Sequence, residues 1–355
     1  MRALFFTGHG DPENLVFGER LEPQPGRDEV VVRLRASALN HLDLFVLRGL
    51  PGVPIELPHT GGADGAGTVA VVGDGVTGWK IGDEVVLNPG LWCGACEACL
   101  RGEESLCPGF RLLGEHVDGT FAEYVKVPAA SLAPKPAHLS WHESAAFGLT
   151  FLTAWRMLMT RARLVSGESV LIHGIGGGVA LAALAFAKLA GATVFATSSR
   201  EDKLARAREM GADHTINYTS ADVVAEIRRL TGRRGVDVVV ETVGQATWMA
   251  SLRCAAKGGR IVTCGATSGP NPTEEVRLIF WNQLSILGST MGSQSDWEAM
   301  VRAVEAGQVR PVLDRVIPLD RGREAYERLA GAAQFGKIVL DVAGGPEAAR
   351  ESAGA

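Results

Sequence analysis

The sequence has no long apolar run, no block of basic residues and no amino-terminal signal-peptide pattern. Its longest apolar stretch begins at Val179 (VALAALAFAKLA), contains Lys188 and is too short to span a bilayer. The first residues, MRALFFTGHGDPENLVF, lack the apolar core and small-residue cleavage site of a secretory signal. The net charge is −5, and no basic run is interleaved with aromatic residues as in nucleic-acid binders. We therefore expect a cytoplasmic protein without a membrane or nucleic-acid partner.

Cysteine is scarce, and its distribution is uneven. Six cysteines occur among 355 residues, and four of them lie between Gly90 and Phe110. Their spacing is C-x2-C-x2-C-x7-C: Cys93, Cys96, Cys99 and Cys107. In a reducing compartment this favours a metal over disulfides, and four thiolates fill the tetrahedral shell of zinc without an open position. The cluster predicts one structural zinc per chain, with four free or redox-active cysteines as the alternative, while Cys254 and Cys264 are expected to be buried thiols.

The order of strand and helix patterns predicts an α/β protein. Hydrophobic residues make up 46% and charged residues 21% of the chain, as is typical of globular proteins. The first 130 residues consist of short β-branched runs between glycine and proline turns. From Ser166 onward strands and helices alternate, which indicates a doubly wound parallel sheet covered on both faces. The last dozen residues are small and polar and are expected to be a disordered tail.

A glycine cluster lies between a strand, SVLIHG, and a helix expected from about Gly178 to Ala190. Glycines at this place allow a tight turn and close approach of the backbone to a pyrophosphate, and the helix start offers free N–H groups. A second strand follows about 20 residues later, which makes the dinucleotide interpretation specific. A glycine-rich turn without a ligand is the alternative. The predicted contacts are Gly174, Gly176, Gly177, Gly178 and Val179.

The end of the second strand, FATSSREDK, bears on the choice of cofactor. An acidic residue there binds the ribose of NAD, whereas a nearby arginine accommodates the phosphate of NADP. The position falls on Ser198, followed by Ser199 and Arg200, with Lys203 one turn later and Tyr218 expected beside the adenosine phosphate. These residues favour NADP(H) over NAD(H). In the alternative, Arg200 is a solvated surface charge and Glu201 or Asp202 reaches the ribose.

Together these motifs resemble the medium-chain dehydrogenase/reductase superfamily, the zinc alcohol dehydrogenase and quinone oxidoreductase group. The resemblance covers nearly the whole chain and includes GADGAGTVAVVGDGVTGWKIGDEVV, the cysteine segment, DGTFAEYVKVP, LTAWRML and GKIVL. It implies a GroES-like catalytic domain over 1–149 with the zinc lobe 90–110, a Rossmann domain over 150–292, and a return to the catalytic domain over 293–355 with the tail.

Family members with a catalytic zinc take ligands from a C-H-x-D string, from G-H-E-G-A-G and from a residue before the segment that matches LTAWRML. Here the first string reads Asn40-His41-Leu42-Asp43, the second begins Gly62-Ala63-Asp64-Gly65, and Leu149 matches the third position. Asn, Ala and Leu cannot form a shell of thiolate and imidazole. The resemblance therefore implies a member that keeps the structural zinc and has lost the catalytic one. Metal binding in another way, through His59 and Asp64, lacks a third ligand.

The remaining chemistry suits hydride addition to an activated acceptor, because no metal is expected to stabilise an alkoxide. Asn40 is expected to donate a hydrogen bond to the developing oxyanion, His41 to deliver a proton or meet cofactor phosphates, and Asp43 to orient a neighbour. In the alternative, His41 is a packed or solvated loop residue. The resemblance also implies Thr150 and Thr153 beside the nicotinamide, with helix capping as the alternative. It extends the cofactor contacts to two further residues, Gly265 and Lys337.

Three functional hypotheses follow. The first is an NADPH-dependent reductase of quinones, enones or activated carbonyl compounds. The second is an alcohol dehydrogenase or carbonyl reductase, and the third is a cofactor-binding sensor or structural protein without turnover. The apolar segment Leu284–Gly292, LSILGSTMG, matches a family edge strand that pairs across a two-fold axis, which implies a homodimer or homotetramer.

Overall fold

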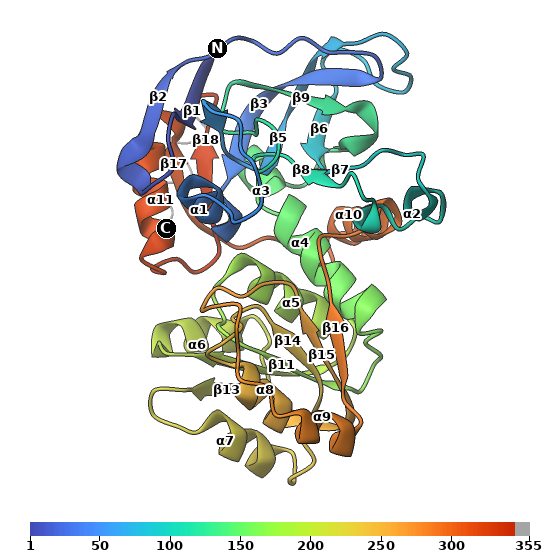
Figure 1. Ribbon diagram of the computed structural model, residues 1–355, viewed down its shortest axis with the longest axis vertical. Helices are drawn as coiled ribbons and strands as arrows, with labels where there is room; N and C mark the ends of the chain where they lie inside the picture. The colour runs from blue at the N-terminus through green and yellow to red at the C-terminus, as the bar shows by residue number, and fades with distance from the viewer. Residues whose placement is uncertain (345–355) are drawn as a thin grey trace. The chain divides into compact units, whose positions relative to one another are not determined.

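The computed structural model describes residues 1–344 and divides into two compact units (Figure 1). Unit 1 comprises Met1–Thr150, Trp297–Gly307 and Pro311–Ala355, and unit 2 comprises Phe151–Asp296 and Gln308–Arg310. The expected domain borders, after residues 149 and 292, lie one and four residues from the borders of the units. The segment expected to be a disordered tail lies, after its first residue, outside the described residues.

Unit 1 is built on a seven-stranded sheet in which β10, β6, β5, β3, β18 and β17 follow one another and β9 also pairs with β3. The strand bounds are β3 Glu29–Ala38, β5 Asp64–Val72, β6 Glu84–Leu87, β9 Tyr124–Pro128, β10 Leu132–Pro134, β17 Leu313–Pro318 and β18 Lys337–Asp341. The β-branched side chains of β3, such as Val30 and Val32, pack in the apolar core of this unit. Strand β18 is buried along its length and pairs antiparallel with β3, Leu340 opposite Ser37. The last described strand thus completes a sheet that the first part of the chain begins.

Smaller elements surround this sheet. The sheet β2-β1-β4 and the pair β7-β8 contain β1 Arg2–Phe6, β2 Leu15–Glu19, β4 His59–Thr60, β7 Gly90–Leu91 and β8 Arg111–Leu112. The α-helices are α1 His41–Arg48, α2 Glu97–Leu100, α3 Trp141–Ala145, α4 Gly148–Trp155, α10 Gln294–Glu305 and α11 Gly322–Ala330. Short 3-10 turns are η1 Pro12–Asn14, η2 Glu104–Leu106, η3 Ala129–Ser131 and η5 Leu319–Arg321. A π-helical segment, η4 Arg156–Arg161, follows α4 and belongs to unit 2. Helix α1 follows β3 after two residues, which places its first turn at the carboxyl end of that strand.

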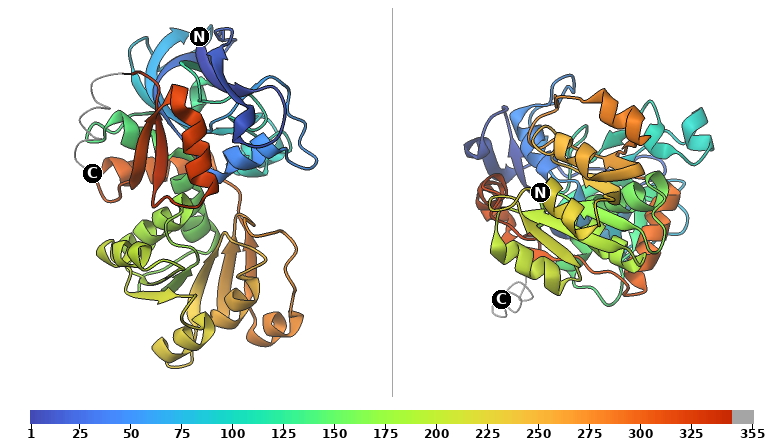
Figure 2. Two further views of the ribbon diagram at one scale, coloured as in Figure 1. Left: turned by 90° about the vertical axis from the view of Figure 1, so that its left-hand side faces the viewer. Right: turned by 90° about the horizontal axis from the view of Figure 1, so that it is seen from below.

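Unit 2 is a six-stranded parallel sheet in the order β13-β12-β11-β14-β15-β16. Its strands are β11 Ser169–Ile172, β12 Thr193–Ser198, β13 His214–Asn217, β14 Val236–Glu241, β15 Ala255–Thr263 and β16 Ser285–Gly288. Its helices are α5 Gly178–Leu189, α6 Glu201–Glu209, α7 Val223–Leu230, α8 Trp248–Cys254 and α9 Val276–Asn282, and they cover both faces of the sheet (Figure 2). The predicted α/β architecture with a doubly wound parallel sheet is confirmed.

The shared direction of the strands in unit 2 determines which edge of its sheet can bind a ligand. Because all six strands run in the same direction, their carboxyl ends lie at one edge of the sheet, where doubly wound folds bind ligands. Helix α5 begins at this edge directly after the glycine cluster. Its alanine- and leucine-rich sequence favours the helix, and Gly191, with φ 77°, follows its carboxyl end in the left-handed conformation. The predicted helix over 178–190 is one residue longer than the observed one.

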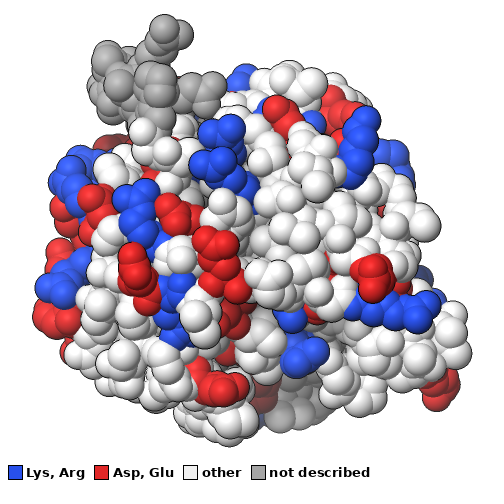
Figure 3. Space-filling model, turned by 90° about the horizontal axis from the view of Figure 1, so that it is seen from above, with Lys and Arg blue, Asp and Glu red and all other residues white. Residues whose placement is uncertain are grey.

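Charges of both signs are mixed on the surface. On the face in Figure 3, Lys and Arg side chains alternate with Asp and Glu, and neither sign forms a continuous patch. Within the described part of the chain, no helix has the length and apolar character needed to cross a membrane. Cys254 is buried as expected, whereas Cys264 is partly exposed, and burial raises the pKa of each thiol to about 12.

Candidate functional site

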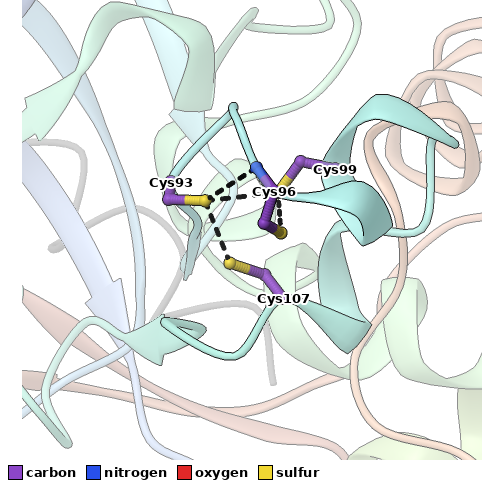
Figure 4. Close-up of side chains that lie close together, drawn as sticks. All are labelled: Cys93, Cys96, Cys99 and Cys107. Carbon is purple, nitrogen blue, oxygen red and sulfur yellow. Dashed lines mark hydrogen bonds between the residues drawn. The ribbon is translucent and has the colours of Figure 1, made fainter.

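The four clustered cysteines converge on one point in a loop of unit 1 (Figure 4). The Sγ atoms of Cys93 and Cys107 are 3.5 Å apart, those of Cys96 and Cys99 3.5 Å, and those of Cys93 and Cys99 3.9 Å. Zn–S bonds of about 2.3 Å in a tetrahedron place the sulfur atoms about 3.8 Å apart, so the donor set fits zinc. Hydrogen bonds from the backbone N–H groups of Ala95 and Cys96 lower the pKa of Cys93 to about 6, which favours its thiolate. Within residues 1–344, this is the one group of three or more His, Cys, Asp or Glu residues close enough to share an ion.

A buried ion pair contacts Asn40, one of the residues that the resemblance matches to a catalytic-zinc ligand. Asp64 begins β5 and has no exposed surface, and its Oδ2 lies 2.8 Å from the ammonium of Lys337 at the start of β18. Asn40, which precedes α1, contacts both partners: its Oδ1 accepts a hydrogen bond from Lys337 at 2.5 Å, and its Nδ2 donates to Asp64 at 3.0 Å. We call these three residues the Asn40–Asp64–Lys337 network. Their amide, carboxylate and ammonium groups form hydrogen bonds and an ion pair with one another, and no thiolate or imidazole takes part.

Helix α4 provides a third hydrogen bond to Asp64. The backbone N–H of Leu149, in the first turn of α4, donates to Asp64 Oδ1 at 2.6 Å. The approach requires a glycine at position 148, because a Cβ there would lie 2.7 Å from the same oxygen. Leu149 therefore acts through its backbone at the position of the third family ligand. A buried carboxylate with three donors, one of them a cation, has the partners that its desolvation demands.

This arrangement bears on the expected roles of Asn40 and Lys337. The expected Asn40 donor to substrate is already used, because its Nδ2 donates to Asp64 and, at 3.5 Å, to the carbonyl of Ala38. Lys337, which was expected to contact the cofactor, is only 5% exposed, and its ammonium is bound by Asp64 and Asn40. Both differences have one cause, since the buried charge of Asp64 needs a cation and a donor close by.

Asp43 and His41 lie in the first turn of α1. Asp43 accepts hydrogen bonds from the backbone N–H groups of Asn40 at 2.7 Å and Gly62 at 3.0 Å, so it orients its neighbours as expected. Burial raises the pKa of Asp43 to about 7, against the effect of these hydrogen bonds and of the Lys337 charge. Burial, and then the charge of Lys337, lowers the pKa of His41. His41 is consequently neutral at pH 7 and is not an imidazolium ready to transfer a proton.

The two threonines of α4 differ in their contacts. Thr150 is 4% exposed, and its hydroxyl has no hydrogen-bond partner among the described residues. An unpaired buried hydroxyl costs about 1–3 kcal/mol, so this group fits a contact to a bound ligand. Thr153 is also buried, but its hydroxyl donates to the Sδ of Met291 at 3.7 Å.

The glycine loop of unit 2 leaves room for a dinucleotide. Gly174 and Gly176 have φ values of 66° and 121°, which favour glycine, and a Cβ on Gly177 would meet no atom within 4 Å. Gly177 precedes α5 without a side-chain cap, so the N–H groups of Gly178 and Val179 are not used by a capping side chain. Gly265 follows β15, where a Cβ would lie 3.4 Å from the carbonyl of Thr242. The loop geometry fits the pyrophosphate of a nicotinamide dinucleotide.

The residues expected to select the cofactor lie together after β12. Ser198 ends this strand, as predicted, and its buried Oγ accepts the N–H of Arg200 at 3.2 Å. Tyr218 is half-exposed and its N–H donates to the Ser198 carbonyl at 3.1 Å. Ser199 and Arg200 are exposed, but the guanidinium of Arg200 is paired with Asp202, Nε to Oδ1 at 2.9 Å. Lys203 is largely buried in the first turn of α6.

Sequence reasoning did not assign a role to Asp64 beyond a weak metal alternative, and it overlooked Glu241. Glu241 is a fully buried carboxylate at the end of β14. The signal for it was present in the segment DVVVETVG, where an acidic residue directly follows three valines at the ligand-binding edge of the sheet.

Comparisons with known proteins place these features in a family context. A family model described as alcohol dehydrogenase GroES-like domain matches residues 26–137, and one described as zinc-binding dehydrogenase matches residues 178–306. A zinc-type alcohol dehydrogenase-like protein of Schizosaccharomyces pombe is 37% identical over 338 residues, 93% of this chain and 94% of that protein.

Two further relatives differ in their named activities. A solved structure of an NAD-dependent alcohol dehydrogenase is 49% identical, has a TM-score of 0.92, and the match covers 96% of this chain and 100% of that one. The human quinone oxidoreductase is 27% identical over 350 residues, 96% of this chain and 97% of that protein. Both alcohol and quinone oxidoreductases are therefore similar to this chain.

The cysteine cluster predicts one zinc per chain after purification without added metal. We expect Cys99→Ser to remove the zinc and to lower the unfolding temperature by about 2–8 °C, the shift that 1–2 kcal/mol gives a domain of this size. Elemental analysis and thermal unfolding measure both effects. Cys264→Ser is the matched control and should leave the zinc content unchanged, and two zinc ions per chain would contradict the prediction.

Proposed function

The chain belongs to the zinc-alcohol-dehydrogenase-like group of the medium-chain dehydrogenase/reductase superfamily, and from this membership and its site we propose an NADPH-dependent oxidoreductase without a catalytic metal. The proposed acceptor is a quinone, an enone or another activated carbonyl compound. The observation that supports the proposal is the Asn40–Asp64–Lys337 network, in which Asn40, matched by the resemblance to a zinc ligand, is bound to a buried carboxylate and a buried ammonium.

The absence of a net charge on the Asp64–Lys337 pair favours a conjugated carbonyl compound as the acceptor. A metal ion lowers the free energy of an alkoxide by several kcal/mol. The ammonium of Lys337 is already paired with the Asp64 carboxylate, so the pair has no net charge to offer an alkoxide. Hydride addition to a conjugated carbonyl needs less assistance, because the electron pair spreads over an enolate or hydroquinone oxygen. Hydrogen-bond donors are sufficient to stabilise such an oxygen.

The proposed reaction assigns a role to each of these groups. A bound dihydronicotinamide supplies the hydride, and the chain's own residues bind, orient and donate. The glycine loop of unit 2 binds the pyrophosphate through backbone N–H groups. In unit 1 the unpartnered Thr150 hydroxyl is the proposed donor to the ligand, and neutral His41 offers a ring N–H for a second hydrogen bond. Asn40, Asp43 and Lys337 hold these groups in place, and the proton that completes the product comes from solvent through Thr150 or His41.

A second function, metal-independent alcohol dehydrogenase or carbonyl reductase, is favoured by the relative that is 49% identical and named as an alcohol dehydrogenase. A third, a cofactor-binding sensor or structural protein, needs only the glycine loop. Turnover separates the third function from the others, and the preferred substrate separates the first from the second.

Steady-state kinetics test the proposed reaction directly. We expect NADPH oxidation with quinones or enones to exceed the oxidation of simple alcohols by at least about 100-fold, because no metal stabilises the alkoxide. A chelator applied briefly, so that the zinc content stays unchanged, should leave the activity intact. Fast alcohol oxidation that the chelator abolishes would show that the mechanism without a catalytic metal is wrong.

The proposed preference for NADPH depends on Ser198, Ser199 and Arg200. A charge-assisted hydrogen bond contributes about 1.5–3 kcal/mol, so Arg200→Ala should raise the Kd of NADPH about tenfold or more and leave that of NADH nearly unchanged. Asp202→Asn is the matched control: it removes the partner that competes for Arg200 and should not weaken NADPH binding. Equal Kd values for NADPH and NADH in the unmodified protein would refute the preference.

We also propose a homodimer or homotetramer that pairs through β16. This strand is the edge of the unit 2 sheet, and Ile286 on it is exposed, as are Val276, Phe280 and Trp281 of the adjacent α9. An apolar edge strand is stabilised when its free N–H and C=O groups pair across a two-fold axis. Light scattering at micromolar concentration should therefore give at least twice the 37.5 kDa of one chain. A Pro substitution at Ile286 should shift the population to monomer, and a monomeric unmodified protein would contradict the proposal.

A further inference from the structure

Glu241 is the centre of a buried polar cluster in unit 2 that the proposed function does not use. It has no exposed surface, and no ion pair joins it to another described residue. Its Oε1 accepts hydrogen bonds from the backbone N–H groups of Val243 at 2.8 Å and Gly244 at 2.9 Å. The hydroxyl of Thr247 lies 2.8 Å from each carboxylate oxygen, and the hydroxyl of Ser251 donates to Oε2 at 2.6 Å. Glu241 thereby fixes the turn that follows β14.

The cluster continues from Ser251 to the glycine loop. The single hydroxyl proton of Ser251 goes to Glu241, the nearer of its two acceptors, so its oxygen must accept from His173 Nε2 at 3.0 Å. His173 then carries its proton on Nε2, and its Nδ1 accepts from the hydroxyl of Thr197 at 3.5 Å. The Thr197 oxygen in turn accepts the N–H of Gly174 at 3.3 Å. All four donors point along the chain of contacts toward Glu241.

The neutral form of His173 agrees with this order of protons. The ring is 2% exposed, and burial lowers the pKa of His173 although the charge of Glu241 opposes the shift. A neutral imidazole has one donor and one acceptor nitrogen, as the contacts require. The direction of the hydrogen bonds follows from the acceptor-only character of the Glu241 carboxylate.

The members of the cluster lie where three segments leave the sheet edge that binds dinucleotides. His173 directly follows β11 and precedes Gly174, the first glycine of the phosphate loop. Thr197 precedes Ser198 at the end of β12, and Glu241 ends β14. The cluster joins the ends of these three strands, whose relative position determines whether one dinucleotide can contact them all.

We propose that Glu241, Ser251, His173 and Thr197 are positioning residues for the cofactor, which hold the first glycine of the phosphate loop in register with the ends of β12 and β14. They act through the backbone of Gly174 and of the turn after β14. The proposal rests on the proposed function only in that the loop binds a nicotinamide dinucleotide, and it holds for NADPH and NADH alike.

Ser169 provides a matched control for the loss of a serine-to-carboxylate hydrogen bond. Its hydroxyl donates to Asp237 at 2.7 Å, at the amino end of β11 in the same sheet and away from the ligand-binding edge. Ser251→Ala and Ser169→Ala each remove one such bond. We expect Ser251→Ala to raise the Kd of NADPH and of NADH about tenfold, the effect of one lost hydrogen bond to a charged group. Ser169→Ala should lower the unfolding temperature about as much as Ser251→Ala does, but it should leave both Kd values unchanged.

The Kd values distinguish a failure of the positioning role from a failure of dinucleotide binding itself. If the unmodified protein binds neither nucleotide, the proposed function fails and the positioning role fails with it. If the unmodified protein binds and Ser251→Ala binds within about twofold of it, only the positioning role is overturned.

The protonation of His173 tests the direction of the hydrogen bonds in the proposed network. In protein labelled with ¹⁵N histidine, the His173 ring should show a protonated Nε2 and an unprotonated Nδ1, assigned by its loss in His173→Asn. Glu241→Gln should move the proton to Nδ1, because the amide NH₂ donates to Ser251 and reverses the order of hydrogen bonds. A proton on Nδ1 in the unmodified protein, or no change in Glu241→Gln, would overturn the proposed network.

Discussion

The ion pair between Asp64 and Lys337 is the interaction on which the candidate site of unit 1 depends. A fully buried carboxylate is strongly destabilising unless a cation or several donors compensate for lost hydration. Lys337, Asn40 and the N–H of Leu149 supply that compensation, and in doing so they fix the carboxyl end of β3, the start of α4 and the start of β18 around one point. The last described strand is therefore joined to the first part of unit 1 by charge as well as by the sheet.

The cysteine cluster and the Asn40–Asp64–Lys337 network have different roles in unit 1. The four cysteines order a loop that is poor in apolar residues, and a complete thiolate shell leaves no position for substrate. The Asn40–Asp64–Lys337 network contains no such shell, and it binds the backbone of Leu149, the residue before Thr150, whose hydroxyl has no partner among residues 1–344. In unit 2, a second buried carboxylate, Glu241, organises the glycine loop by hydrogen bonds alone. Both carboxylates act as fixed acceptors that determine the conformation of the backbone around them.

Local patterns in the sequence were sufficient to predict the α/β architecture, the cysteine cluster and the strand–glycine–helix unit. The cysteine spacing and the glycines are encoded within short segments, and helix α5 follows from an alanine- and leucine-rich run. The partner of Asp64 could not be found in this way, because Lys337 lies 297 residues from Asn40 in sequence and meets it only after β18 has joined β3. The hydrogen bond from the Asn40 amide to Asp64 could not be found for the same reason. Arg200 and Asp202 are close in sequence, but the sequence does not show whether Arg200 binds Asp202 or the phosphate of NADP.

A double-mutant cycle on the free energy of unfolding tests the central interaction most directly. Lys337→Met and Asp64→Asn are each expected to destabilise the zinc-loaded protein by about 3–5 kcal/mol, because each leaves a buried charge without its partner. The double variant should be less destabilised than the sum of the two by at least about 2 kcal/mol, since neither charge remains. Additive effects would mean that Lys337 does not neutralise Asp64, and they would contradict the account of this site.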